Sequence, residues 1–340
     1  MNHNEAPPWA VMMEMLRGSW VTQCLNAAAR LGIADHLADG PRTAEEVARR
    51  SGARAPSIFR LMRTLASLGV LTEPSSGKFG LSPMGQCLRT GVPGTLRDFA
   101  IAVNDHVHWS AWGRFADAVR TGEPMVREAV GMELWEYYAK HPEEGARFSA
   151  GMGNLSNLIT PALVESYDFS RATKIVDVAG AHGVLLAEIL QRNPKARGVL
   201  FDLPHVVKDA RPVLERYQVA DRVEIAPGDF FKEVPAGGDV YLLKHIIHDW
   251  DDERAIQILK SVRAAMKPTG KVLIFELPIP PDNQPSPAQL MDMNMLVMLS
   301  GKERTEAEYG SLLEAAKLKL DRLISTLTPY AIVEASAASR

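Results

Sequence analysis

The second half of the chain alternates short apolar runs with amphipathic segments. The runs are rich in Val, Ile and Leu and have the length of buried strands. The candidate strands are residues 173–180, 198–204, 222–230, 239–246 and 271–278, and the candidate helices between them are 183–193, 206–217 and 251–267. Strands that alternate with helices predict a parallel sheet with helices on both faces.

Two further β-rich pieces follow at 318–326 and 330–336, which makes seven strands in all. Only a few residues separate them, so we expect an antiparallel hairpin, because a parallel pair needs a longer crossover. A Pro-rich loop at 277–289 follows the last strand of the parallel set, where it would form a rim or a lid beside the carboxyl edge of the sheet.

The first half of the chain is predicted to be mostly helical. Residues 9–40 carry apolar side chains on more than one helix face, which favours association with a second subunit over a single buried core helix. Thr43 and Glu46 have the spacing of a capping box that opens a short helix. Ile58 to Leu68 then repeat at helical spacing up to Gly69, and two short apolar pieces around residues 74–78 form a hairpin. This order of elements is typical of a winged helix.

A winged helix allows two interpretations. Between residues 42 and 89, eight basic and three acidic residues leave a local excess of +5, which is what DNA binding requires. The alternative is a winged helix that serves as a scaffold within a larger enzyme, and we favour it, because fold alone does not imply function.

The bulk composition narrows the class of protein. A chain of 340 residues with 46% hydrophobic and 23% charged residues is long enough for about two domains with buried cores. A net charge of −3 gives no global attraction to nucleic acid or to an anionic membrane. Cys24 and Cys87 are too few for a disulfide framework, and no signal peptide or membrane span is recognisable. We therefore expect a cytoplasmic protein with no nucleic-acid or membrane partner.

Residues 176–183 read VDVAGAHG and have the form of a strand, a tight turn and a helix start. Ligands of open parallel sheets bind beyond the carboxyl ends of the strands. Asp202 ends the next strand, where it can accept hydrogen bonds from both ribose hydroxyls of an adenosine. The G-x-G-x-x-G pattern of dinucleotide sites is absent, and Asp177 would repel a pyrophosphate but favour the cationic groups of S-adenosylmethionine (SAM). Asp177 could also bond nearby backbone amides.

Six motifs together carry a resemblance to a known family: VDVAGAHG, FDLPHVV, PGDFF, DVYLLKHIIHDWDDE, GKVLIFE and GKERTEAEYGSLLEAA. In this order they resemble the SAM-dependent O-methyltransferases of the plant caffeate and bacterial polyketide type, over nearly the whole chain. The resemblance implies a Rossmann-like seven-stranded α/β domain at 171–340, a winged-helix-like dimerisation domain at 1–95 and a helical linker at 96–170 that contributes to the acceptor pocket. It also implies a homodimer.

The resemblance assigns the cofactor site, with SAM as methyl donor, S-adenosylhomocysteine as product and no metal. It implies that Asp202 binds the ribose, that Asp229 and Phe230 flank the adenine, that Lys244 reaches the cofactor, and that the glycines keep the turn tight. The cofactor-binding set is Asp177, Ala179, Gly180, Gly183, Asp202, Leu203, Asp229, Phe230 and Lys244. The sequence departs from the family at Ala179 and Ala181, where glycine is more frequent. An added methyl disfavours positive φ, so we expect SAM to bind to a slightly altered loop.

His248 follows a strand and so lies beyond the carboxyl edge of the sheet. An aryl hydroxyl has a pKa near 10 and an imidazole a pKa near 6.5, so a neutral His can serve as base while the hydroxyl attacks. The resemblance makes His248 the base, oriented by Glu303 and flanked by Glu276, with Asp249 shaping the loop. Glu303 could instead be an exposed charge at a helix start, and His245 is the structural member of the histidine pair.

No metal is expected, because Asp251 and Asp252 suit a helix N-terminus and no cluster of His or Cys residues would complete a metal site with them.

A small aromatic acceptor is expected to contact Met and aromatic side chains that align with acceptor-lining regions of the family. The predicted acceptor residues are Asn104, His108, Trp109, Phe148, Met152, Met291, Asn294 and Met295. Two alternatives to O-methylation stay open: a SAM-binding homologue with altered chemistry (hydroxylation, decarboxylation or N-methylation), and a winged-helix regulator that senses a small molecule.

Overall fold

The computed structural model describes residues 6–282 and 284–338, which form two compact units. Unit 1 contains the residues up to Trp109 together with Trp135–Leu155. Unit 2 contains Ser110–Leu134 and the residues from Ser156 onward. The helical segment 96–170 is thus divided between the two units.

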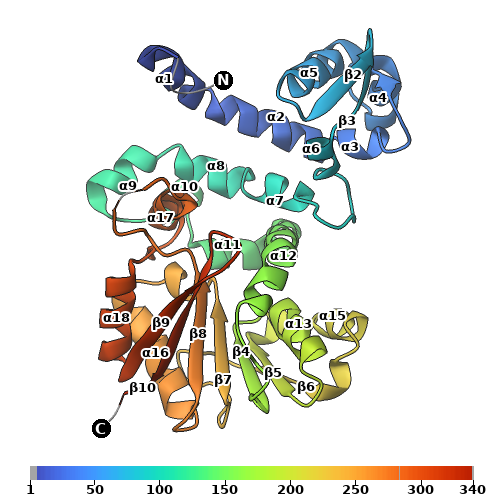
Figure 1. The fold of residues 1–340 in the computed structure, drawn as a ribbon. Coiled ribbons are helices and arrows are strands. Elements are labelled where there is room, and N and C mark those ends of the chain that lie inside the picture. The colour runs from blue at the N-terminus through green and yellow to red at the C-terminus, as the bar shows by residue number, and fades with distance from the viewer. Residues whose placement is uncertain (1–5, 283, 339–340) are drawn as a thin grey trace. The chain divides into compact units, whose positions relative to one another are not determined.

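Unit 2 is built on a seven-stranded sheet with the order β6-β5-β4-β7-β8-β10-β9 (Figure 1). The first five strands of that order pair in parallel, whereas β10 pairs antiparallel with both β8 and β9. The strands are β4 (Lys174–Val178), β5 (Arg197–Asp202), β6 (Val223–Pro227), β7 (Val240–Lys244), β8 (Lys271–Glu276), β9 (Leu318–Ser325) and β10 (Ala331–Ala337). The predicted parallel sheet and terminal hairpin are confirmed.

Alternation along each strand divides the apolar residues between the two faces of this sheet. Val176 and Val178 of β4 pack with β7, β8 and the helices α16 (Asp252–Ala265) and α18 (Glu306–Ala315). On the other face Leu186 of α13 (Val184–Arg192) lies against Gly198, where a Cβ atom would meet its side chain at 2.8 Å. Helices therefore cover both faces, as expected.

The remaining helices of unit 2 are short, apart from α17. They are α9 (Phe115–Thr121), α10 (Val126–Val130), α14 (Pro204–Val207), α15 (Arg211–Arg216), the 3-10 turns η1 (Ala220–Arg222) and η2 (Ile247–Asp249), and α17 (Pro287–Met298). Ser286 and Gln289 form a capping box at the start of α17, so the last residues of the predicted loop 277–289 are helical. Asp251 caps α16 by accepting a hydrogen bond from the Arg254 amide, as its sequence position predicted.

Unit 1 contains the predicted winged helix. The Thr43–Glu46 capping box opens α4 (Ala44–Ser51), α5 (Ala55–Ser67) follows, and β1 (Arg42–Thr43), β3 (Lys78–Leu81) and β2 (Leu71–Ser75) form a small antiparallel sheet. Its core includes Ile58, Met62 and Leu65 of α5, which are almost completely buried. The other helices that lie wholly or mostly in unit 1 are α1 (Pro8–Leu16), α2 (Gly18–Arg30), α3 (Ile33–His36), α6 (Pro83–Gln86), α7 (Arg97–Ala102), α8 (His106–Trp112), α11 (Leu134–Lys140) and α12 (Pro142–Glu165).

Helix α1 buries none of its residues within the chain. Its exposed side chains include Trp9, Met12, Met15 and Leu16, and Trp20 of α2 is also exposed. The alternative of a buried core helix is therefore wrong for α1. No helix among the described residues is long and apolar enough to cross a membrane.

Candidate active site

The carboxyl edge of the parallel strands brings together most of the predicted cofactor and catalytic residues. The loop 179–183 follows β4, Asp202 ends β5, Lys244 ends β7, and Glu276 ends β8. Asp229 lies just beyond β6, and η2 carries His248 and Asp249 just beyond β7. Because neighbouring parallel strands end at one edge, these residues share one region of unit 2.

The loop after β4 keeps a left-handed backbone at both of its alanines. Ala179 has φ 57° and Ala181 has φ 49°, in the region that glycine adopts most readily. The two methyl groups are thus accommodated in a glycine-like backbone at the cost of strain. The amide of Ala181 donates to Asp202 Oδ2 at 2.9 Å, and the amide of Ala179 donates to the Phe201 carbonyl at 2.7 Å. These hydrogen bonds fix the loop to β5.

Carboxylates dominate the electrostatics of this loop. Asp177 is 2% exposed, and its Oδ2 has no hydrogen-bond partner within the described part of the chain. Burial raises the pKa of Asp177 to about 7 against the attraction of Lys244, and burial lowers the pKa of Lys244 to about 8 against the attraction of Asp177. Burial also raises the pKa of Asp202, although the Leu203 and Ala181 amides oppose the shift.

These observations provide a test of whether the residues fit SAM. A buried carboxylate with an unpaired oxygen gains from a cationic group and is destabilised by a pyrophosphate. SAM carries an ammonium, a sulfonium and ribose hydroxyls, which match carboxylates at the ends of successive strands. Lys244 Nζ donates to Ser156 Oγ at 2.6 Å and does not form an ion pair that would neutralise Asp177. The donor set therefore fits SAM.

Replacing Ala179 and Ala181 together by glycine is expected to raise the melting temperature by a few degrees. A left-handed L-residue costs about 1 kcal/mol relative to glycine, and in a unit of this size each kcal/mol corresponds to about 2–4 °C. Because the loop already has the glycine-like backbone, the Kd for SAM should change by less than about threefold. Differential scanning fluorimetry and calorimetric titration of SAM check both values.

Ala264→Gly is the matched control, because Ala264 is an exposed residue within α16. There the same substitution is expected to lower the free energy of unfolding by about 0.5–1 kcal/mol. SAM affinity that rises tenfold or more in the loop variant would show that the alanines distort the binding site after all.

His248 and Glu303 form a buried pair. His248 Nδ1 lies 2.6 Å from Glu303 Oε1, and the two residues are 7% and 2% exposed. Glu303 precedes the N-cap of α18, Thr305, by two residues and points inward, so the interpretation of Glu303 as an exposed helix-start charge is wrong. The hydrogen bond to Nδ1 leaves Nε2 as the nitrogen available to a ligand, with Asp249 Oδ1 3.5 Å away.

This pair controls the protonation of the imidazole. Burial lowers the pKa of His248, but the Glu303 hydrogen bond and the charges of Asp249, Glu303 and Glu276 outweigh burial and raise it to about 10. Burial raises the pKa of Glu303, against the opposing effect of His248. Burial also raises the pKa of Asp249 to about 7, although the nearby His248 opposes this. The site is therefore a stronger base than a free imidazole.

Glu276 contacts the backbone of His248. Its Oε1 accepts from the His248 amide at 3.0 Å, and its Oε2 accepts a short hydrogen bond from the Tyr309 hydroxyl. Burial raises the pKa of Tyr309 well above its usual value, so the phenol stays a donor. Glu276 is thus placed to hold the segment that carries His248, and Tyr309 on α18 is a residue that the sequence analysis missed.

Arg304 is a second residue that the sequence analysis missed. It is 1% exposed and donates to the Ile247 and Trp250 carbonyls at 3.1 and 2.9 Å. Arg304 therefore binds the backbone on both sides of His248. Arg304 also pairs with Asp252 at 2.8 Å. On the other side, Asp292 Oδ1 accepts from the Glu303 amide at 3.0 Å. In the sequence, the one signal for Arg304 is that it follows Glu303 in the GKER motif.

Gly301 permits the close approach of this segment to His248. A Cβ atom built at Gly301 would overlap the carbonyl oxygen of His248 and the backbone of Asp249 and Trp250. Only glycine fits without moving the segment that carries His248.

Gly301→Ala is therefore expected to lower kcat by roughly 10²-fold, since a shift of about 1 Å in a catalytic group can have that effect. Steady-state kinetics with SAM affinity measured alongside checks this. Gly310→Ala in α18 is the control, because its Cβ would make only an ordinary contact with Leu320 at 3.9 Å. Equal kcat in the two variants would contradict the prediction.

The predicted acceptor residues lie in both units. On α17 in unit 2, Met291, Asn294 and Met295 have a spacing that places them on one helix face, and Asn294 Oδ1 accepts from Trp112 Nε1 at 3.0 Å. In unit 1, His108 stacks on Phe148 with ring centroids 5.9 Å apart. The others in unit 1 are Asn104, which is buried, Met152, which is half-buried, and Trp109, which is 47% exposed.

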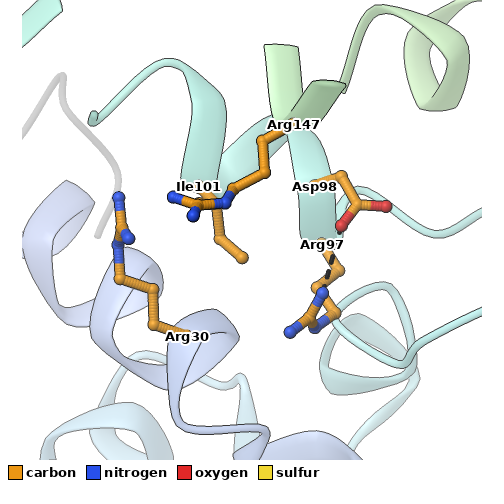
Figure 2. A pocket seen from close by; sticks show the side chains of 5 residues that line it. All are labelled: Arg30, Arg97, Asp98, Ile101 and Arg147. Atoms are coloured by element: carbon orange, nitrogen blue, oxygen red, sulfur yellow. Dashed lines mark hydrogen bonds and ion pairs between the residues drawn. The ribbon is translucent and has the colours of Figure 1, made fainter. Parts of the chain in front are cut away.

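Unit 1 also contains a hollow of about 330 Å³ lined by Arg30, Arg97, Asp98, Ile101 and Arg147 (Figure 2). None of these is a predicted site residue. Arg97 pairs with Asp98 at 3.1 Å, and Arg30 donates to Asn26 at 2.9 Å. Arg147 lies 3.4 Å from Glu143. Each guanidinium thus has at least one partner, although Nε of Arg97 is buried without one among the described residues.

Comparison with known proteins decides the family. The model of the O-methyltransferase domain matches residues 112–319, and that of the O-methyltransferase dimerisation domain matches residues 13–91. The chain belongs to the SAM-dependent O-methyltransferase family. The resemblance, the α/β fold with an N-terminal dimerisation domain, the enzyme class and the cofactor are confirmed.

Individual relatives of this methyltransferase cover nearly its whole length. Phenazine O-methyltransferase PhzM of Lysobacter antibioticus is 42% identical over 97% of this chain and 96% of that protein. The mitomycin biosynthesis 6-O-methyltransferase of Streptomyces lavendulae is 35% identical over 94% of this chain and 92% of that protein. Among solved structures, the O-methyltransferase NcsB1 from neocarzinostatin biosynthesis, in complex with SAM and 2-hydroxy-5-methyl naphthoic acid, has a TM-score of 0.79 at 31% identity. That match covers 93% of this chain and 96% of NcsB1.

The match to a dimerisation domain assigns the winged helix of this methyltransferase to an enzyme, in agreement with the scaffold interpretation. No group of three or more His, Cys, Asp or Glu within residues 6–282 and 284–338 is arranged to hold a metal ion.

Proposed function

We propose that this methyltransferase methylates a hydroxyl of a small aromatic metabolite, with His248 as the base and Glu303 as the group that orients it. The observation that carries this proposal is the 2.6 Å contact between His248 Nδ1 and Glu303 Oε1 in a buried position. A carboxylate on the distal nitrogen fixes the tautomer and stabilises the imidazolium, so Nε2 is left to face the acceptor hydroxyl.

When bound, SAM supplies an electrophilic methyl group on a sulfonium. Asp177, with its unpaired buried Oδ2, is proposed to face a cationic part of this ligand, and Asp202 to accept hydrogen bonds from its ribose. Asp229 and Phe230 beyond β6, with Leu203, are proposed to surround the adenine. Lys244 lowers the negative potential that Asp177 would otherwise impose.

The chain's contribution to the chemistry is to place a proton on His248 while the acceptor oxygen is anionic. A neutral His248 can take the proton from the hydroxyl, or an already protonated His248 can bind the acceptor as a phenolate. Both routes give the same imidazolium–phenolate pair, and Glu303 stabilises the imidazolium in each. A base whose pKa is raised to about 10 matches an aryl hydroxyl, so the proton transfer is close to balanced.

Glu276, Asp249 and Arg304 are proposed to position the base. Glu276 accepts from the His248 amide, and Arg304 binds the carbonyls on either side of the base. Near-in-line alignment supplies much of the acceleration of a displacement at carbon, so a fixed base is worth more than a mobile one.

An aromatic acceptor is supported by the relatives named above, one a phenazine O-methyltransferase and one solved with a naphthoic acid. The α17 residues Met291, Asn294 and Met295 are proposed to contact it, because Met side chains adapt to a flat ring. The unit 1 residues Asn104, His108, Trp109, Phe148 and Met152 are proposed as further acceptor contacts.

We also propose a homodimer. The dimerisation-domain match covers residues 13–91, and the exposed apolar side chains of α1 and α2 form the kind of surface that a second subunit covers. Sedimentation of the full chain tests this, and Trp9→Glu with Trp20→Glu is expected to weaken association.

The test of the proposed activity is transfer from methyl-labelled SAM to a panel of phenols, with products identified by mass spectrometry. An O-methylated phenol together with S-adenosylhomocysteine supports the proposal. A hydroxylated, decarboxylated or N-methylated product would assign the altered chemistry instead, and the absence of transfer to every hydroxyl acceptor would overturn O-methylation.

A further inference from the structure

Glu303 belongs to a short segment whose backbone is held by individual contacts. Residues 301–305 lie in neither a helix nor a strand, so no regular hydrogen-bond ladder fixes the backbone that carries this carboxylate. The side chain is held at one oxygen only. Oε1 contacts His248 Nδ1, whereas Oε2 is buried without a hydrogen-bond partner among the described residues. The placement of the carboxylate beside His248 therefore depends on how the Glu303 backbone is held.

Asp292 of α17 contacts this backbone at Glu303 itself. Its Oδ1 accepts a hydrogen bond from the Glu303 amide at 3.0 Å. A hydrogen bond from an amide to a carboxylate is stronger than one between neutral groups. A buried amide without an acceptor is costly, so a segment that loses one shifts to satisfy it. The next residue is held separately, because the Arg304 carbonyl accepts from the Ile279 amide at 3.0 Å.

The charges around this link come from several elements of unit 2. Burial raises the pKa of Asp292, whereas its hydrogen bond with the Glu303 amide opposes the shift. The charges that raise the pKa of His248 belong to other carboxylates, so Asp292 acts on the imidazole through Glu303. The titratable groups around Asp292, Glu303 and His248 are His245, Asp249, Glu276, Lys302, Arg304, Glu308, Tyr309 and Tyr330.

Building on the proposed function, we propose that Asp292 is a positioning residue that keeps the Glu303 carboxylate on the distal nitrogen of His248. It acts through the backbone of Glu303 and not on the imidazole. Asp292 lies on α17, between Met291 and Met295. The helix proposed to contact the acceptor thus also fixes the carboxylate that orients the base, so that a displacement of α17 changes both.

The direct test is the titration of His248 by ¹⁵N NMR in protein labelled at histidine, with the ring assigned from the spectrum of His248→Gln. Asp292→Ala removes the acceptor of the Glu303 amide, whereas Asp292→Asn removes the charge but keeps a side-chain carbonyl oxygen. In Asp292→Ala the carboxylate is no longer held on the ring, so the pKa of His248 is expected to fall by at least about one pH unit toward its ordinary value. Asp292→Asn is expected to titrate like the wild type.

Kinetics on one phenol test the same link during catalysis. Asp292→Ala is expected to lower kcat by roughly tenfold, because a small displacement of a catalytic group is enough for such a loss. The KM for the acceptor is expected to stay within about threefold of the wild-type value, and Asp292→Asn to keep both. Leu290→Ala is the matched control, because Leu290 is a 75% exposed residue of the same helix and is not among the site residues.

A role of Asp292 in the stability of α17 alone would lower the melting temperature and raise the KM while the titration of His248 stayed in place, and that result would overturn the proposal. Equal losses in Asp292→Ala and Asp292→Asn would overturn it as well, because the charge and not the hydrogen bond would then be responsible. If Asp292→Ala does not fold, Asp292→Leu, which has a similar volume but no acceptor oxygen, replaces it. The proposed function fails separately, if no phenol is methylated, and the NMR titration then still decides the role of Asp292.

Discussion

His248→Ala is expected to lower kcat by roughly 10²–10⁴-fold, which is the usual contribution of general acid–base catalysis. The variant loses the group that accepts the hydroxyl proton and leaves Glu303 as a buried carboxylate without its 2.6 Å partner. The Kd for SAM should change by less than about threefold, because most residues proposed to hold SAM lie at the ends of other strands. Lys244 is the exception, since it ends the strand that precedes His248. Single-turnover transfer from labelled SAM measures the chemical step directly.

A loss of SAM binding in His248→Ala would point to general damage of the site instead of loss of the base. His248→Gln, which preserves volume and a hydrogen-bonding end, should be nearly as inactive as the alanine variant. Full activity in either variant would refute the proposed mechanism.

Glu303→Gln is expected to move the pH dependence of kcat/KM to lower pH. In the wild type the pKa of His248 is raised to about 10, so the neutral base increases with pH and kcat/KM should rise from pH 7 toward pH 10. Removing the carboxylate removes a hydrogen bond and a charge that favour the imidazolium. The inflection of the kcat/KM profile should therefore move down toward about pH 6.5, the pKa of a free imidazole. The plateau should be lower, by at least about tenfold, because the imidazolium formed during transfer loses its partner.

The same acceptor must be used throughout, since its own ionisation contributes to the alkaline limb equally in both enzymes. Glu253→Gln is the matched control, because Glu253 is an exposed carboxylate in the first turn of α16. It should leave the profile of the wild type in place. An unshifted inflection in Glu303→Gln would show that the carboxylate does not set the basicity of His248.

The architecture was predictable because it depends on local periodicity. The five parallel strands were recognised from β-branched apolar runs, and their order along the chain placed Asp202, Lys244 and His248 at one edge of the sheet. The terminal hairpin followed from the short connection between 326 and 330. Each of these features depends on neighbours within about ten residues, which a single sequence reveals.

The backbone of the loop after β4 was not predictable. Alanine argues against positive φ, yet Ala179 and Ala181 both adopt it. The reason is tertiary: the amide of Ala181 donates to Asp202, 21 residues away, and that of Ala179 to the neighbouring strand. Long-range hydrogen bonds outweighed a local preference of about 1 kcal/mol.

The sequence by itself determined the fold class, the family and the cofactor, because these depend on motif order and on strand ends. Only the tertiary structure decided how His248, the proposed base, is held. Arg304, Tyr309 and Gly301 lie more than 50 residues from His248 in the sequence, and their roles arise from contacts that no local pattern encodes. The hydrogen bond from the Glu303 amide to Asp292 likewise became visible only in the tertiary structure, since it joins α17 to the segment before α18 by a contact that no local periodicity predicts.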